Sequence, residues 1–105
     1  MINKKILKIR RDLDKLDNKF LNLIKKRTLL VNEIVRNKKF KKDIIDKKRI
    51  RVILSNIKKK SKTRNIDSQI TYKIWSSMIK AYIEYEYRKF KKNNYFICCV
   101  EVVFF

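Results

Sequence analysis

Apolar residues recur at alternating steps of three and four along the first third of the chain. The row consists of Ile6, Ile9, Leu13, Leu16, Phe20, Leu23, Leu30 and Ile34, with Arg27 in one of its positions. This spacing is typical of one face of an α-helix and predicts a helix from about Asn3 to Lys39. A small domain cannot bury so long a row by itself, so we predict a homodimer in which the long helices pack against each other.

Two shorter helices are predicted after a polar connection over residues 39–45. Asp46 is a good N-cap for a second helix of about fifteen residues, and residues 61–65 interrupt its pattern. Asp67 or Ser68 caps a third helix that reaches about Lys92. The second helix has one apolar stripe, made of Ile50, Ile53, Leu54 and Ile57. The predicted inner face of the third helix comprises Ile70 or Thr71, Ile74, Trp75, Met78, Ile79, Tyr82 and Glu86. The pattern therefore predicts an all-α fold with three helices.

The last residues form a separate apolar segment. Tyr95 to Phe105 are apolar, β-branched or aromatic with one Glu, and eleven residues are too few to cross a bilayer as a helix. The segment could add an edge strand, cover an apolar patch of the dimer, or have no selected role. We therefore divide the chain into a helical domain, residues 1–92, and a C-terminal tail, residues 93–105, whose role the sequence leaves open.

The composition removes several classes of protein. The chain has no Gly and no Pro, which argues against all-β folds and Gly-loop nucleotide-binding folds. It has no His, and its two cysteines, Cys98 and Cys99, are neighbours. These residues supply no zinc ligand set, no Ser-His or Cys-His pair and no disulfide framework, so we expect neither a metal nor a cofactor. The charged, amphipathic N-terminus does not resemble a signal peptide, and we expect a cytoplasmic protein.

The chain is strongly basic, with 30 Lys and Arg against 10 Asp and Glu and a net charge of +20. Such a balance is common in proteins that bind nucleic acid or another polyanion. However, Lys greatly outnumbers Arg, and Ile and Asn are abundant, which is what an AT-rich coding sequence produces. The runs of Lys are predicted to lie on outer faces or in connections. A solvated surface is therefore the simpler interpretation, and nucleic acid is not the expected partner.

A few charged residues fall on the predicted inner faces instead. Arg27 interrupts the apolar row, Lys38 follows it eleven residues later on nearly the same face, and Glu86 lies one turn after Tyr82. Burying an unpaired charge costs several kcal/mol, so each of these groups requires water or an oppositely charged partner. Arg27 could extend to solvent and Glu86 could form an ion pair across the bundle. Together with Arg10 and Arg49, however, they predict a pocket for a small dianion.

In their order and spacing, these residues resemble the all-helical chorismate mutases of the AroQ class, which include a branch of isochorismate pyruvate lyases. The resemblance covers residues 6–92. It rests on Leu7–Asp17 (LKIRRDLDKLD), Phe20-Leu21, Lys26-Arg27, Lys38, Asp46–Arg49 (DKKR), Ile74–Ile79 (IWSSMI) and Tyr82–Glu86 (YIEYE). It implies a three-helix fold with a long first helix, an intertwined homodimer and chorismate as substrate.

The resemblance also implies a role for each candidate residue. Arg10 reaches into the partner's site, while Arg27 and Arg49 hold substrate carboxylates, which suits the bidentate geometry of guanidinium. Lys38 and Glu86 are the implied catalytic residues, both directed at the ether oxygen. Asp46 helps to position the ring hydroxyl, and Tyr82 is the remaining substrate-binding residue.

Two positions depart from the pattern of the mutases. Ile50 stands where these enzymes commonly have a Glu, and Tyr82 where they often have a Ser. Both changes resemble the lyase branch, whereas Asp46 is retained as in the mutases. We predict a chorismate mutase that forms prephenate, with isochorismate pyruvate lyase as the alternative. The residues also leave open an inactive relative, or a basic helical module that binds nucleic acid through Lys on a continuous outer face.

Overall fold

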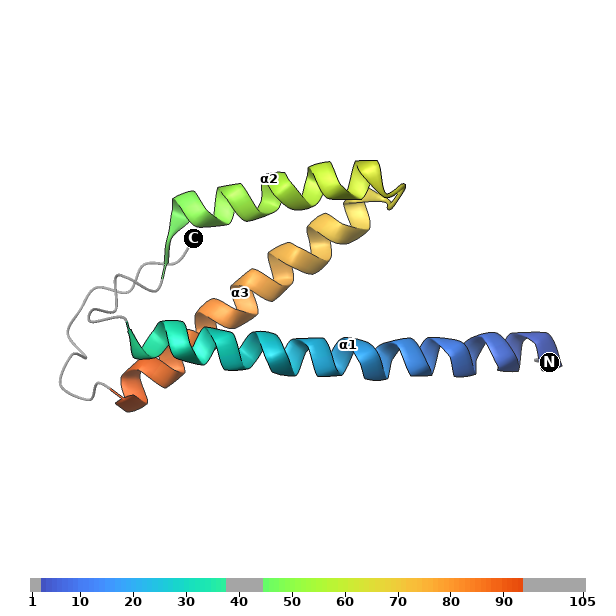
Figure 1. Ribbon diagram of the computed structural model, residues 1–105, viewed down its shortest axis with the longest axis horizontal. Helices are drawn as coiled ribbons and strands as arrows, with labels where there is room; N and C mark the ends of the chain where they lie inside the picture. Colours follow the sequence, from blue (N-terminus) through green and yellow to red (C-terminus); the bar gives the residue numbers. More distant parts are fainter. Residues whose placement is uncertain (1–2, 38–44, 94–105) are drawn as a thin grey trace. The chain divides into compact units, whose positions relative to one another are not determined.

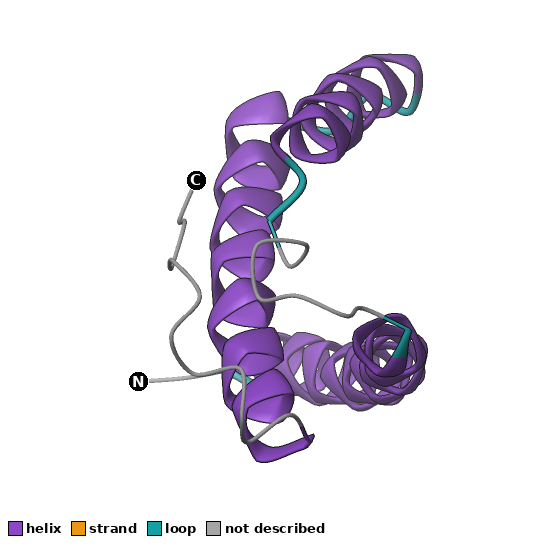
Figure 2. Cartoon of the chain, turned by 90° about the vertical axis from the view of Figure 1, so that its left-hand side faces the viewer, coloured by secondary structure: helices purple, strands orange, loops and turns teal. Residues whose placement is uncertain are grey.

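The computed structural model describes residues 3–37 and 45–93, with side chains up to Phe90, and these residues form three α-helices (Figure 1). The helices are α1 (Lys4–Arg36), α2 (Lys47–Thr63) and α3 (Ser68–Asn93). No strand interrupts them within the described ranges (Figure 2). The predicted all-α, three-helix fold is thus confirmed. Residue 93, the first of the predicted tail, is the last residue of α3, and the rest of the tail, including Cys98 and Cys99, lies outside the described residues.

The chain divides into two compact units, Met1–Val31 and Asn32–Phe105. The first contains most of α1. The second contains the last turn of α1 together with α2 and α3.

Helix α1 begins and ends at asparagine side chains. The side-chain oxygen of Asn3 accepts a hydrogen bond from the backbone N–H of Ile6 at 2.9 Å, which is an N-cap. At the other end, the side-chain amide of Asn37 donates to the backbone carbonyl of Glu33 at 2.8 Å. The backbone N–H of Asn37 donates to the carbonyl of Ile34 at 3.0 Å. The predicted end near Lys39 was therefore too late, because Asn37 closes the helix in a turn after Arg36.

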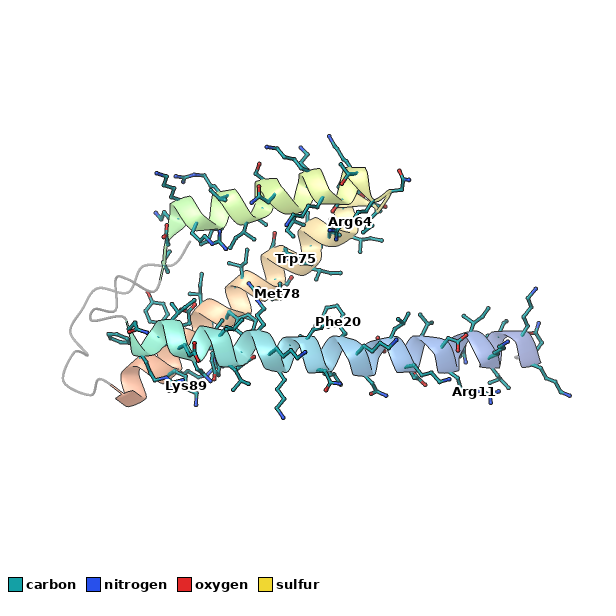
Figure 3. The ribbon with its side chains drawn as sticks, in the orientation of Figure 1. Arg11, Phe20, Arg64, Trp75, Met78 and Lys89 are labelled. Atoms are coloured by element: carbon teal, nitrogen blue, oxygen red, sulfur yellow. The ribbon has the colours of Figure 1, made fainter. Side chains whose placement is uncertain are left out.

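The apolar row of α1 is exposed. Its members range from 41% exposed at Ile6 to 64% at Leu23, and Phe20, labelled in Figure 3, is 48% exposed. Arg27 is half-buried. An exposed apolar row of this length is typical of a surface that contacts a partner.

Helices α2 and α3 form a hairpin with a tight turn at Arg64–Asp67 (Figure 1). Asn65 has φ 54°, and the N–H groups of Asn65 and Ile66 donate to the carbonyls of Lys62 and Ser61 at 3.3 and 2.8 Å. This is the Schellman arrangement, in which Asn takes the left-handed position that Gly usually occupies. Asp67 then caps α3, since its carboxylate accepts from the N–H of Gln69 at 2.8 Å.

The predicted break over residues 61–65 was wrong at its start, because α2 continues to Thr63. Ser61 is buried where α2 meets α3, and its hydroxyl lies 2.7 Å from that of Thr71, which is also buried. The Ser61 hydroxyl also donates to the carbonyl of Ile57 at 2.7 Å. These contacts satisfy two hydroxyl groups that would otherwise be costly to bury.

The core of the second unit lies farther along α3 than predicted. The buried apolar residues are Val35 of α1 and Ile79, Ile83, Tyr87 and Phe90 of α3. Thr71 and Ile79 are inner residues as predicted, but Ile70 and Ile74 are 56% and 39% exposed. Val35 in the last turn of α1 is buried together with this half of α3. None of the described helices is long and apolar enough to cross a membrane.

The left-handed residue of the hairpin gives a test of the turn. We expect Asn65→Gly to raise the free energy of unfolding by a few tenths of a kcal/mol and Asn65→Ala to lower it by about 1 kcal/mol. The same Gly replacement at Asn56, exposed within α2, should instead lower stability by about 0.5–1 kcal/mol. Urea denaturation measures all three. A loss of stability in Asn65→Gly as large as in Asn56→Gly would contradict a left-handed conformation at Asn65.

Candidate active site

The predicted site residues are distributed over all three helices. Helix α1 carries Arg10 and Arg27, the start of α2 carries Asp46 and Arg49, and α3 carries Tyr82 and Glu86. Lys38, the remaining predicted catalytic residue, lies outside the described residues.

The first turn of α2 holds Asp46 in a fixed orientation. Asp46 is the N-cap, and its carboxylate accepts a hydrogen bond from the backbone N–H of Arg49 at 2.9 Å. Its carbonyl accepts from the N–H of Ile50 at 3.0 Å. Asp46 and Arg49 are exposed while Ile50 is half-buried, so the carboxylate and the guanidinium are both accessible to a ligand. The prediction of Asp46 as N-cap is confirmed.

Tyr82 and Glu86 lie one turn apart on α3, and both are half-buried. The ring of Tyr82 meets that of Tyr85 edge to face, with centroids 6.2 Å apart and planes at 87°. Both Tyr82 and Glu86 take part in polar or aromatic interactions, so neither is a loose surface group. The carboxyl group of Glu86 is thus carried on a partly desolvated, aromatic part of the helix.

Tyr85 connects this part of α3 to the end of α1. Its hydroxyl donates to the side-chain oxygen of Asn32 at 2.7 Å. The charged groups of Arg88 and Lys89 lie 5.9 and 5.7 Å from the centroid of its ring, within the range of cation–π attraction. Sequence reasoning missed Asn32 and Tyr85, because a pair 53 residues apart leaves no local pattern.

Arg10 and Arg27 are far apart on one continuous helix. They are separated by 17 residues of α1, which corresponds to about 26 Å along the axis at 1.5 Å per residue. Arg10 is exposed and Arg27 is half-buried. A small dianion cannot contact both guanidinium groups of one chain. If both bind substrate, they serve different sites.

A groove of about 570 Å³ lies between α2 and α3 near their connecting turn. It is lined by Leu54, Ser55, Ile57, Lys58, Ser68, Gln69, Thr71 and Tyr72. None of the predicted site residues lines it, and Lys58 is its one charged residue. This groove is therefore not suited to a dianion. The described residues also contain no group of acidic or cysteine side chains that could hold a metal ion.

The three helices agree with the all-α fold that the sequence resemblance implies. The family model described as chorismate mutase type II matches residues 9–87. Because the match covers most of the chain, the protein belongs to the chorismate mutase type II family. No curated protein and no solved structure matches the chain.

The capping role of Asp46 can be separated from a role in the site. Asp46→Ala removes the cap and should lower the free energy of unfolding by about 1 kcal/mol, whereas Asp46→Asn keeps a capping side chain and should cost a few tenths. If the carboxylate positions substrate, both variants should lower kcat/KM for chorismate. Urea denaturation and steady-state kinetics measure the two effects. A fall in kcat/KM that simply tracks the loss of stability would limit Asp46 to capping.

Proposed function

We propose that this protein catalyses the rearrangement of chorismate to prephenate, in the biosynthesis of aromatic amino acids. The observation that carries the proposal is the family match over residues 9–87. The presence of Arg10, Arg27, Asp46 and Arg49 supports it, because they supply cations and a positioned carboxylate along that same stretch.

The reaction suits a protein without His or an activated thiol. It is an intramolecular pericyclic step, in which the ether C–O bond breaks as a C–C bond forms. No nucleophile, metal or cofactor takes part. The protein can accelerate it by holding the side chain over the ring and by placing donors where negative charge grows on the ether oxygen.

The side chains divide between these two tasks. Arg27 and Arg49 bind the substrate carboxylates and so restrict the substrate to the reactive conformation. Lys38 and Glu86 donate hydrogen bonds to the ether oxygen as its charge increases. Asp46, fixed by its bond to the N–H of Arg49, orients the ring hydroxyl.

The proposal includes a homodimer with shared sites. The exposed apolar row of α1 supplies a contact surface, and the distance of about 26 Å between Arg10 and Arg27 prevents one chain from using both in one site. Two antiparallel α1 helices related by a two-fold axis near residues 18 and 19 put Arg10 level with the partner's Arg27. A closed dimer of this kind has two equivalent sites.

A second activity is favoured by two particular residues. Ile50 and Tyr82 are both half-buried and replace the polar residues that the mutases commonly have there. An apolar residue after Arg49 removes a contact to the substrate hydroxyl, which resembles the isochorismate pyruvate lyases. The presence of Asp46 favours the mutase.

Substrate conversion decides between the two activities. Purified protein should be given chorismate and isochorismate separately, with prephenate and salicylate measured as products. We expect prephenate from chorismate at a rate that Arg49→Ala lowers by at least about 100-fold, since a bidentate carboxylate contact is lost. Salicylate from isochorismate with no prephenate would establish the lyase. Absence of both products from folded protein would contradict the proposed function.

Glu86 gives the reaction a pH dependence. To donate to the ether oxygen it must be protonated, so turnover should fall as pH rises through the titration of Glu86. The amide of Glu86→Gln donates at every pH, and this variant should show a flatter profile with activity retained near neutrality. The measurement is kcat against pH for both proteins. Loss of turnover at all pH values in folded Glu86→Gln would show that the carboxylate has another role.

A further inference from the structure

Helix α2 carries a dense and unneutralised set of cations. Eight of its 17 residues are Lys or Arg, and none is Asp or Glu. Six of the eight share one side of the helix and are exposed: Lys47, Lys48, Arg51, Lys58, Lys59 and Lys62. We call these six residues the basic face of α2.

The basic face has an internal repeat. Lys47, Lys48 and Arg51 recur eleven residues later as Lys58, Lys59 and Lys62. Eleven residues bring a helix back to within about 20° of the same direction, about 16 Å farther along the axis. The six residues therefore form two clusters of three cations each, and the two clusters are aligned along the helix.

The opposite side of α2 packs against α3. Ile53, Leu54 and Ile57 are half-buried there, near the buried contact of Ser61. In Figure 3, side chains with nitrogen ends project from α2 on the side away from α3. The packing of the hairpin thus leaves all six cations exposed, with Lys58 at the edge of the groove between α2 and α3.

The other helices do not share this property. In α1, acidic residues alternate with the basic ones, as at Asp12, Asp14 and Asp17. In α3, Glu84 and Glu86 stand among the cations. Composition bias alone makes every surface rich in Lys, but it does not account for the alignment on α2. A continuous outer face of cations is the feature that contact with successive phosphates requires.

We propose that the basic face of α2 binds the phosphate backbone of double-stranded nucleic acid without sequence preference. Aligned cations that neutralise several phosphates release condensed counterions, which provides most of non-specific affinity. The face consists of five lysines and one arginine and carries no aromatic residue, so it can contact phosphates but has little means to read bases.

An anionic membrane surface is the less favoured partner. A helix that lies in a membrane interface inserts an apolar face into the lipid. Ile53, Leu54 and Ile57 of α2 face α3 instead, and Val52, 42% exposed, is the one exposed large apolar residue of α2. This proposal does not depend on the enzymatic function, because none of the six residues is assigned to the active site.

The test is fluorescence anisotropy of a short labelled DNA duplex at several salt concentrations. The variant Lys58→Gln/Lys59→Gln/Lys62→Gln removes one cluster. Its matched control, Lys4→Gln/Lys5→Gln/Lys8→Gln, removes the same charge from exposed positions of α1. We expect the α2 variant to bind at least about tenfold more weakly at low salt, with a slope of log K against log salt shallower by about two to three.

The change in log K of the control variant should be less than half of the change in the α2 variant. The variant Lys58→Arg/Lys59→Arg/Lys62→Arg, which keeps the charge, should bind like the unaltered protein. DNA of unrelated sequence and RNA duplex should bind alike, since only phosphates are contacted. Equal losses of affinity in the two Gln variants would show that binding depends on net charge alone, and would overturn the proposal. So would binding to vesicles containing phosphatidylserine with none to either duplex. Circular dichroism confirms that each variant remains helical.

Discussion

The apolar row of α1 consists of eight large side chains that are between 41% and 64% exposed. Burying the remainder of these side chains is worth on the order of 10 kcal/mol before the cost of association, which is comparable with the whole stability of a small domain. The same helix keeps Arg10 and Arg27 about 26 Å apart. In the proposed dimer, this one helix would account for both features: a partner helix covers the row, and each site is completed by a residue of the other chain.

In the second unit, local hydrogen bonds fix the ends of the helices. Without Gly or Pro, the chain ends its helices with Asn and Asp side chains: Asn37 closes α1, Asp46 opens α2 and Asn65 occupies the left-handed position of the turn. The bond between Tyr85 and Asn32 fastens α3 to the last turn of α1, one residue before Glu86. Arg49 and Glu86 are thus carried on helices whose ends are fixed by local hydrogen bonds, which favours a preorganised site.

The features that the sequence predicted well are those with a local pattern. The row of α1, the cap at Asp46 and the cap at Asp67 follow from spacing and residue type within one helix, and the family resemblance depended on such short motifs. Burial of Ile83, Tyr87 and Phe90 was missed, because it depends on packing between residues that are far apart in the sequence. The α2 helix continues past Ser61, and the contact of its hydroxyl with the buried hydroxyl of Thr71 is one that the predicted interruption over residues 61–65 did not include. The buried residues of α3 thus depend on long-range packing, which local propensity does not predict.

Complementation between two inactive variants tests the shared site most directly. Arg10→Ala and Arg27→Ala proteins, each inactive alone, should be unfolded together and refolded as a mixture. In a heterodimer, one site regains both arginines and the other loses both. Random pairing should therefore restore about a quarter of the activity toward chorismate of the unaltered protein. If heterodimers form, as shown by two different affinity tags, and activity is not restored, Arg10 does not act in its partner's site and the shared-site dimer is contradicted.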